Sequence, residues 1–558
     1  MELSGYRVKY FEDGQKMDIA AGSNAHYTVN TDITDESIRA SITARSRIQL
    51  HTVSLVFDYK FLYNDKFFGN GYQSWTTSLE YRSTDSMKDV IPIAVTKRLR
   101  NTAGISGDTR FVDFPKKKGC FYSHCYTYIR NGADVNLIGS LTEKQGFTVI
   151  YADMIEGKLT ISKDVEGVTL EEGETYELLD AVNLKGTYDE VFYKYFGKMN
   201  LPAPRTNHLA GYTSWYNYFK KIDEDTMFRD LTALDTVKDS VNIFQIDDGY
   251  ETAVGDWLEL NKEDFPSGMK EVADRIHRKG YKAGIWLAPF NCQTTSLVFR
   301  NHRDWLVKDS AGLPRMGVIN WGGAYVLDIY NDNARNYIKH FFDVILNEWG
   351  YDMVKLDFLY SQCLYPRNNK SRGTIMCEAM AFLRECCGDK LILGCGVPLG
   401  AAFGYVDACR VGCDVDIVYG GRFYNALHVN NEIPSAKNSI TNAIFRRHLN
   451  GRAFCNDPDV FFLRYSNLQF NMDQKKLLAG VNHIFGDVLF VSDNAEEYEP
   501  EDVKLLKKAF SESSCKVVSA DLEGKEGRIV LDFDGNERTL YFDLETGDSN
   551  IDQVLFNN

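Results

Sequence analysis

Residues 242–290, with the sequence NIFQIDDGYETAVGDWLELNKEDFPSGMKEVADRIHRKGYKAGIWLAPF, decide the fold of this chain. Two short apolar runs, at 242–250 and 282–290, enclose a segment with the period of an amphipathic helix. Ser267 is placed to cap that helix, and Gly280 lies just past its end. Apolar residues at helical spacing define its inner face: Met269, Val272, Ala273 and Ile276. The stretch therefore predicts one strand–helix–strand repeat.

The same alternation continues on both sides of this stretch. Eight short apolar runs can be marked, at 208–215, 242–250, 282–290, 353–360, 390–398, 407–416, 453–464 and 487–493. Another helix is indicated by a stripe that ends at Gly350: Ile338, Phe341, Phe342, Ile345, Leu346 and Trp349. Eight such repeats predict a (β/α)8 barrel over residues 205–510. A doubly wound open sheet is the competing arrangement, but no glycine-rich phosphate turn follows the first run.

The segments that flank the predicted barrel are rich in β-structure. Residues 1–200 predict an antiparallel β-sandwich domain, because short alternating segments such as 6–10, 41–44 and 159–162 are separated by turn clusters. The connector at 201–205, LPAPR, has two prolines in three residues and is expected to be stiff. Three strand-like runs after residue 510 predict a small C-terminal β-sandwich domain over 511–558.

Composition excludes several classes of function. The chain has 558 residues, of which 44% are hydrophobic and 25% charged, as in ordinary globular proteins. Its formal net charge of −15 at pH 7 would repel nucleic acids and anionic membranes, so neither is an expected partner. No run approaches the ~20 apolar residues that a membrane span requires. The start, MELSGYRVKYFEDG, lacks the pattern of a secretory signal.

Cysteine and histidine usage bear on location and metal binding. The twelve cysteines are irregularly spaced and include the adjacent pair Cys386 and Cys387, which favours free thiols and a cytoplasmic location. The ten histidines form neither an HxH nor an HExxH motif, so no metal site is expected.

Carboxylates collect at the carboxyl ends of the predicted strands, the rim at which (β/α)8 barrels place their active sites. Lys355 and Asp357 alternate along one strand and therefore point to the same side. Because a neighbouring lysine lowers the pKa of an aspartate, Asp357 is expected to be ionised and suited to act as a nucleophile. A purely structural ion pair is the alternative.

Asp414 follows 57 residues after Asp357, two predicted strands further around the barrel. Two carboxyl groups placed in this way can flank one bond at the ~5–5.5 Å separation of a retaining glycosidase. The weakly polar run before Asp414 is expected to favour its protonated, acid form. There are two alternatives: Asp414 pairs only with Arg410, or Asp416, on the same side of the strand, takes the acid role.

Asp247 and Asp248 end another strand, directly before Gly249. Two adjacent carboxylates at a strand end suit the vicinal hydroxyls of a sugar. A simple turn cap is the alternative.

Several short motifs occur in a fixed order along the predicted barrel: QIDDGY at 245–250, GDW at 255–257, FP at 265–266, GIW at 284–286, KLD at 355–357, RVGCD at 410–414 and NDPD at 456–459. This series resembles glycoside hydrolase family 36, the α-galactosidases of the melibiase clan. The resemblance extends to the flanks, because that family has an N-terminal β-supersandwich, a (β/α)8 TIM barrel and a small C-terminal β-domain.

The resemblance implies a role for each matching residue. Asp357 would be the nucleophile and Asp414 the general acid/base of a retaining α-galactosidase. Asp247 and Asp248 would bind the 4- and 6-hydroxyls of the sugar, and Lys355 its 3- and 4-hydroxyls.

Further positions follow from the same resemblance, which implies neither a metal nor an organic cofactor. Arg410 would reach toward the 2-hydroxyl and steady the acid. Trp215 and Trp286 would form walls against the sugar ring, with plain barrel packing as the alternative for both. Cys395 and Gly396 lie in the loop that reads the substituent at C2.

The chain departs from the family pattern in two respects. The loop at the end of its fifth predicted strand, GCGVP at 394–398, is shorter than the corresponding loop of many members, which leaves selectivity at C2 open. The chain is also shorter than many relatives. The family implies a homo-oligomer of two to four copies, but the contacts of that oligomer cannot all be transferred to this chain. In addition, the segment FGNGYQSW at 68–75 is unusual for a sandwich strand, and we hypothesise that Trp75 adds a wall over the barrel mouth.

The expected reaction is hydrolysis, with retention, of terminal non-reducing α-D-galactosyl residues from oligosaccharides such as melibiose and raffinose. An α-N-acetylgalactosaminidase and a galactosyl-transferring enzyme like raffinose synthase are alternatives within the same chemistry. A non-catalytic carbohydrate-binding protein is the alternative from a different class, although it would have no need of a nucleophile beside an acid.

Overall fold

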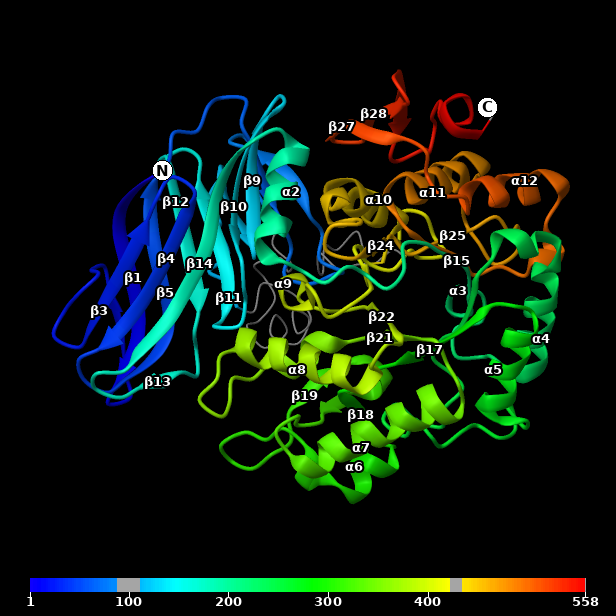
Figure 1. Ribbon diagram of the computed structural model, residues 1–558, viewed down its shortest axis with the longest axis horizontal. Helices are drawn as coiled ribbons and strands as arrows, with labels where there is room; N and C mark the ends of the chain where they lie inside the picture. The colour runs from blue at the N-terminus through cyan, green and yellow to red at the C-terminus, as the bar shows by residue number, and fades with distance from the viewer. Residues whose placement is uncertain (88–110, 422–433, 557–558) are drawn as a thin grey trace. The chain divides into compact units, whose positions relative to one another are not determined.

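The computed structural model describes residues 1–87, 111–421 and 434–556 (Figure 1). Contacts divide the chain into two compact units. The first comprises Met1–Pro202 together with Tyr360–Phe382 and Val397–Phe403. The second comprises Ala203–Leu359, Leu383–Gly396 and Gly404–Asn558. The Trp75 loop belongs to the first unit, and all other predicted site residues belong to the second.

Two antiparallel sheets form the body of the first unit (Figure 1). One sheet has the order β2-β1-β5-β12-β11-β8, with β13 paired to β5, and the other has the order β3-β4-β14-β10-β9-β6-β7. Their strands are β1 (Glu2–Glu12), β2 (Gln15–Ile19), β3 (Tyr27–Ile33), β4 (Ser37–Ala44), β5 (Ile48–Asp58), β6 (Lys66–Gly69), β7 (Leu79–Arg82), β8 (Cys120–His124), β9 (Tyr126–Asn131), β10 (Asp134–Ser140), β11 (Phe147–Asp153), β12 (Lys158–Asp164), β13 (Thr169–Leu170) and β14 (Thr175–Gly186). The predicted N-terminal antiparallel sandwich is confirmed.

Period-two burial explains how the two sheets meet. Along β4, Ile38, Ala40 and Ile42 are buried, whereas Arg39 and Ser41 between them face outward. Leu50 and Leu55, from β5 of the other sheet, belong to the same hydrophobic core. Helix α2 (Tyr188–Met199) follows the last strand and packs Phe192 against aromatic rings of β9.

The second unit contains a nine-stranded sheet in which every pairing is parallel. Its order is β24-β23-β22-β21-β17-β16-β15-β26-β25. The strands are β15 (Leu209–Thr213), β16 (Ile243–Ile246), β17 (Lys282–Leu287), β21 (Met353–Leu356), β22 (Leu391–Gly394), β23 (Ala408–Arg410), β24 (Cys455–Asp457), β25 (Val460–Phe461) and β26 (Val488–Val491).

The two ends of this sheet meet, which closes it into a barrel. Strands β24 and β25 lie at opposite ends of the strand order, yet only Pro458 and Asp459 separate them in the chain. One predicted strand, at 453–464, is therefore split: its first half pairs with β23 and its second half with β26. The predicted (β/α)8 barrel is confirmed, and its strands are buried on both faces as parallel strands require.

Helices alternate with the barrel strands along the chain. They are α3 (Trp215–Tyr218), α4 (Glu224–Ala233), α5 (Gly268–Arg278), α6 (Leu297–Asn301), α7 (Asp332–Asp343), α8 (Arg372–Cys387), α9 (Leu399–Ala402), α10 (Ala436–Phe445), α11 (Met472–Phe485) and α12 (Pro500–Ala509). Helix α5 has Ser267 as its N-cap residue and buries the four predicted apolar residues. The stripe predicted after residue 338 continues past α7 as a π-helical turn, Val344–Glu348.

An insertion between β17 and α7 was not predicted from the sequence. It forms a small antiparallel sheet of β18 (Asn291–Gln293), β20 (Ala324–Val326) and β19 (Met316–Val318), in that order. The short helix η4 (Asn320–Gly322) connects β19 to β20 and carries Trp321.

The C-terminal strands form one antiparallel sheet, β27 (Lys516–Glu523), β28 (Glu526–Phe533) and β29 (Asn536–Asp543). In the described part of the C-terminal segment this sheet is a single layer, so the two packed sheets of the predicted C-terminal sandwich are not observed there. The apolar face of β28, with Ile529 and Leu531, is nonetheless buried.

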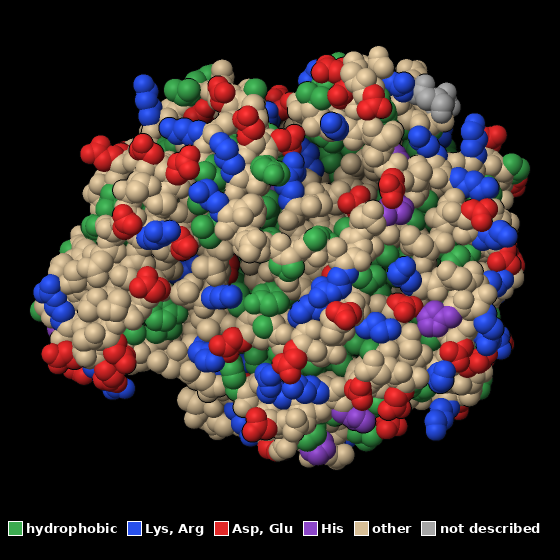
Figure 2. Space-filling view, in the orientation of Figure 1, with side chains coloured by type: hydrophobic (Ala, Val, Ile, Leu, Met, Phe, Trp, Pro, Cys, Tyr) green, Lys and Arg blue, Asp and Glu red, His purple; other side chains and the backbone are tan. Residues whose placement is uncertain are grey.

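Acidic and basic side chains are interspersed on the face that Figure 2 shows. Among the described helices, none combines the length and the apolar character that crossing a membrane requires.

Candidate active site

Ten of the eleven predicted site residues lie in the barrel unit, within or just after the carboxyl ends of its strands. The acidic pair follows β16, the KLD motif ends β21, and the RVGCD motif begins in β23. Because the strands are parallel, these ends share one rim of the barrel. The sequence-predicted residues are therefore brought together there, with Trp75 as the exception.

Asp357 follows β21 directly and is 8% exposed. The indole N–H of Trp286 donates to its Oδ2 at 3.1 Å, and the backbone N–H of Phe358 donates to its Oδ1 at 2.8 Å. Phe358 has a φ of 53°, a left-handed conformation that is uncommon for an aromatic residue and aims its N–H at the carboxylate.

Burial raises the pKa of Asp357. Lys355 lowers this pKa, the charge of Asp414 raises it, and hydrogen bonds from Trp286 and Cys395 lower it again. The predicted low pKa is therefore wrong in direction, because desolvation outweighs the lysine. The charge of Asp414 is thus one of those that act on the Asp357 carboxylate.

Lys355 forms its ion pair with Asp247, and not with Asp357 as we considered from the sequence. Its Nζ donates to Asp247 Oδ2 at 2.8 Å, and Gln245 Nε2 donates to the same oxygen at 2.8 Å. Although burial alone would lower the pKa of Lys355, the charge of Asp247 raises it overall. Lys355 thus stays charged and links the acidic pair to the strand that carries Asp357.

Asp248 is held by two residues that the sequence did not point to. Trp321 Nε1 donates to its Oδ2 at 3.0 Å, and Lys220 Nζ lies 3.1 Å from the same oxygen. Trp321 lies in the unpredicted insertion, where no strand or helix period marks it. Glu251 also hydrogen-bonds Asp248, and burial together with the charge of Asp248 raises the pKa of Glu251 well above its usual value.

Asp414 lies four residues beyond the end of β23. Its side chain is 41% exposed, and Arg410 Nη1 donates to its Oδ1 at 2.7 Å. The pairing weighed as an alternative is thus present, and the weakly polar setting expected for this carboxyl is not. The rival Asp416, in contrast, is buried, at 7% exposure.

Arg410 contacts two further carboxylates: Asp457, the last residue of β24, and Asp459, in the turn before β25. Its Nε donates to Asp457 Oδ2 at 3.3 Å, and its Nη2 lies 2.8 Å from Asp459 Oδ1. The NDPD motif contains both residues, but the sequence did not indicate what they would contact. Tyr216, from α3, donates its hydroxyl to Asp459 Oδ2.

The predicted aromatic walls differ in their surroundings. Trp286 is 2% exposed, turns its N–H toward Asp357, and packs between Trp257 and Trp321 with ring centroids at 5.7 and 6.0 Å. Trp215 is half-buried and lies edge-on to Phe219. Trp75, in the first unit, lies 6.0 Å from the ring of Tyr360, and its placement over the barrel mouth stays a prediction.

Cys395 and Gly396 follow β22. Burial raises the pKa of the Cys395 thiol well above its usual value, so the thiol stays neutral and donates to Asp357. Gly396 has a φ of 55°, which lets the loop turn away from the strand without a Cβ in the way.

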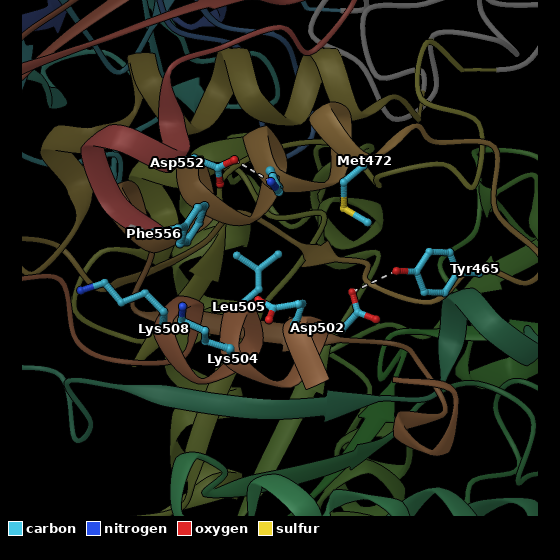
Figure 3. Close-up of a pocket in the computed structure, with 10 residues that line it drawn as sticks. Tyr465, Met472, Asp502, Lys504, Leu505, Lys508, Asp552 and Phe556 are labelled. Atoms are coloured by element: carbon cyan, nitrogen blue, oxygen red, sulfur yellow. Dashed lines mark hydrogen bonds and ion pairs between the residues drawn. The ribbon is translucent and has the colours of Figure 1, made fainter. Parts of the chain in front are cut away.

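A separate cavity of about 270 Å³ lies against α11 and α12 (Figure 3). Lys504, Leu505 and Lys508 line one side, and Asp552 on another side pairs with Lys476. Its lining contains none of the predicted site residues, so it is not the candidate active site.

A family model described as Melibiase matches residues 213–375. Among curated relatives, "Alpha-galactosidase 1" of Pediococcus pentosaceus is 27% identical over 139 residues, 23% of this chain and 18% of that protein. The "A type blood alpha-D-galactosamine galactosaminidase" of Flavonifractor plautii is 32% identical over 134 residues, 22% of this chain and 12% of that protein. The chain thus matches less than a fifth of the length of either relative.

Solved structures share the architecture over nearly the whole chain. The α-galactosidase TtGalA of Thermus thermophilus, in complex with p-nitrophenyl α-D-galactopyranoside, superposes with a TM-score of 0.69 at 23% identity and covers 96% of this chain and 98% of its own. The GH36 α-galactosidase AgaA of Geobacillus stearothermophilus gives a TM-score of 0.62 at 11% identity, over 97% of this chain and 81% of its own. The resemblance to glycoside hydrolase family 36 is confirmed, and these neighbours share the multidomain fold.

Proposed function

We propose that this chain is a retaining α-galactosidase that releases terminal non-reducing α-D-galactosyl residues. The observation that carries the proposal is the placement of Asp357 and Asp414 at one barrel rim, after β21 and β23, where one affects the ionisation of the other. The family match and the relatives that are named α-galactosidases support this choice of substrate. In this proposal the chain's own carboxylates supply both the nucleophile and the proton.

In the first step, ionised Asp357 attacks the anomeric carbon and forms a C1–O bond. The bond from C1 to the glycosidic oxygen breaks, and the proton of Asp414 passes to that oxygen as it departs. Trp286 and the N–H of Phe358 hold the attacking carboxylate in place. In the second step Asp414 takes a proton from water, which attacks C1 and frees Asp357.

Recognition of galactose falls to the acidic pair and Lys355. Asp247 and Asp248 would accept hydrogen bonds from the 4- and 6-hydroxyls, and Lys355 would donate to the 3- and 4-hydroxyls. Because these polar groups are buried, a sugar with a misplaced 4-hydroxyl would leave them unpaired and be rejected.

Azide rescue tests the two catalytic assignments and the stereochemistry together. Asp357→Ala should lose turnover of nitrophenyl α-galactoside, and azide should then give the β-galactosyl azide by single inversion. Asp414→Ala should keep the first step on this activated substrate, and azide should give the α-galactosyl azide. Asp416→Ala is the matched control: rescue there, and not at Asp414, would move the acid role to Asp416.

A 2-amino or 2-acetamido sugar is the second candidate, because the Flavonifractor relative is named a galactosaminidase. In this proposal Cys395 and Gly396 would read this substituent. Turnover of nitrophenyl α-galactoside, α-galactosaminide and α-N-acetylgalactosaminide by the same preparation separates the possibilities. Faster turnover of either amino sugar would replace galactose in the proposal.

The proposal extends to the natural substrate and to the acceptor of the galactosyl group. Structures of neighbours are in complex with stachyose and raffinose, which supports small α-galacto-oligosaccharides, melibiose and raffinose among them, as substrates. We further propose a cytoplasmic location and a homo-oligomer. Product analysis at high sucrose distinguishes hydrolysis from galactosyl transfer.

A further inference from the structure

Arg410 is a buried cation that bonds three carboxylates at once. It is 2% exposed and contacts Asp414, Asp457 and Asp459 through separate guanidinium nitrogens. A guanidinium bonded to Asp414 alone would strongly favour the ionised carboxylate. An ionised Asp414 could not give a proton to a departing oxygen, so the charge of Arg410 must be offset.

Asp459 is placed to provide this offset. Its Oδ1 lies 2.8 Å from Arg410 Nη2, and its Oδ2 accepts the N–H of Val415 at 2.7 Å. Val415 is the residue next to Asp414, so Asp459 bonds both the cation that holds Asp414 and the backbone that carries it. Tyr216 donates to Oδ2 from a third direction. The Asp459 side chain is buried, with 2% of the residue exposed.

The backbone at Asp459 is also specialised. Its φ of 74° lies in the left-handed region, where aspartate and asparagine are tolerated better than other residues with a side chain. The turn after Pro458 thus directs the Asp459 carboxylate inward at the point where the barrel closes.

We propose that Asp459 is a positioning residue. Its carboxylate offsets the positive charge of Arg410 at the guanidinium nitrogen that does not bond Asp414, so that Asp414 can hold the proton it must donate. This inference rests on the proposed function, since it concerns the acid of that reaction. Asp459 would not touch the sugar.

Several other ionisable groups among the described residues act on this cluster. Around Asp414 and Asp459 they are Arg410, Asp457, Asp357, Cys395, Cys413 and Tyr216. Burial raises the pKa of Asp459 to about 7, with Arg410 lowering it and the charges of Asp414 and Asp457 raising it. Asp459 is therefore most fully charged, and offsets the charge of Arg410 most, above about pH 7.

Asp459→Asn removes the negative charge but keeps the shape and tolerates the left-handed backbone. Because a nearby negative charge stabilises a protonated carboxyl, its loss should move the alkaline limb of kcat/KM to lower pH by about one unit. Melibiose, whose leaving group needs a proton, should lose about tenfold more kcat/KM than nitrophenyl α-galactoside, whose leaving group does not. Asp459→Glu, which restores the charge, should recover most of the alkaline limb.

Asp407→Asn is the matched control. Asp407 directly precedes β23, the strand that ends at Arg410, and is a buried carboxylate paired with Arg205 and Arg384. Its amide variant should lose stability without moving the alkaline limb. If Asp459→Asn does not fold, Tyr216→Phe, which removes one donor from Asp459, should shift the limb in the same direction by a smaller amount.

The proton of Asp414 can also be followed without turnover, by its carboxyl ¹³C resonance, identified by its loss in Asp414→Asn. A titration midpoint that falls in Asp459→Asn supports the inference. An unchanged midpoint and an unchanged alkaline limb overturn it, even in an active enzyme. Absence of α-galactosidase activity in the unaltered chain overturns the proposed function instead, and the titration still decides whether Asp459 acts on Asp414.

Discussion

Asp357 owes its chemistry to contacts that its sequence neighbours do not specify. Position 357 and its strand follow from the KLD motif, but the lysine two residues earlier is committed to Asp247. Donors from β17 and from the next peptide hold the carboxylate. The ionised form that a nucleophile requires is thus favoured against burial by hydrogen bonds from outside the motif.

Trp286→Phe should therefore shift the acidic limb of the pH profile. The indole N–H favours the charged form of Asp357, so its removal should raise the pKa of Asp357 further. Activity requires that form, and the acidic limb of kcat/KM should move to higher pH, with a roughly tenfold loss near pH 5 from one charge-assisted hydrogen bond. Trp257→Phe is the control, because Trp257 packs on Trp286 while its own buried N–H has no partner among the described residues. Equal shifts in both variants would contradict the role of the N–H.

Residue identities at the site were thus largely predictable, but their partners were not. Asp247, Asp248, Asp357 and Asp414 stand out because carboxylates at strand ends are costly without a use. Trp321 could not be found in the same way, because its contact with Asp248 depends on an insertion without periodicity. Pairings of this kind arise from tertiary structure, which spacing along the chain does not encode.

At the scale of elements, the strands were predictable because burial on both faces makes parallel strands continuous apolar runs. All eight predicted runs contain an observed strand. The division of the run 453–464 into β24 and β25 was not predicted, since it reflects the closure of the barrel and not a local preference. The C-terminal strands were also predicted, whereas their arrangement as one layer depends on which partners cover them.

Gly211→Ala should disrupt the pairing of β15 with β16. A Cβ at Gly211 would lie 1.8 Å from the carbonyl oxygen of Ile243, a backbone atom that cannot rotate away. We expect a loss of more than about 3 kcal/mol in the free energy of unfolding, measured by chemical denaturation. Gly5→Ala, in strand β1, is the control because its Cβ would meet only Val56 at 3.8 Å. Equal stability of the two variants would show that the β15–β16 pairing can relax.

At the scale of the whole molecule, the first unit is discontinuous in sequence. It extends beyond Pro202 to two later stretches, Tyr360–Phe382 and Val397–Phe403. The proline-rich connector at 201–205 marks where the sequence pattern changes from β-rich to alternating strands and helices. No local sequence pattern indicates that the two later stretches belong to the first unit. Long-range ion pairs and close backbone approaches, such as that of Gly373 to Glu143, join these stretches to the sandwich.

Arg372→Met tests how much the returning stretch contributes to the first unit. Arg372 is 8% exposed, pairs with buried Asp164 at 3.0 Å, and bonds Glu166 at 2.6 Å. Its removal leaves Asp164 buried without its cation, which should cost about 3–5 kcal/mol of unfolding free energy. Arg39→Met is the control: Arg39 and Asp180 form a pair of exposed side chains that should contribute less than about 1 kcal/mol. Thermal unfolding of both variants, with the fragment 1–202 alongside, measures the difference. A fragment that unfolds cooperatively at the midpoint of the full chain would show that the sandwich needs neither Arg372 nor the stretch that carries it.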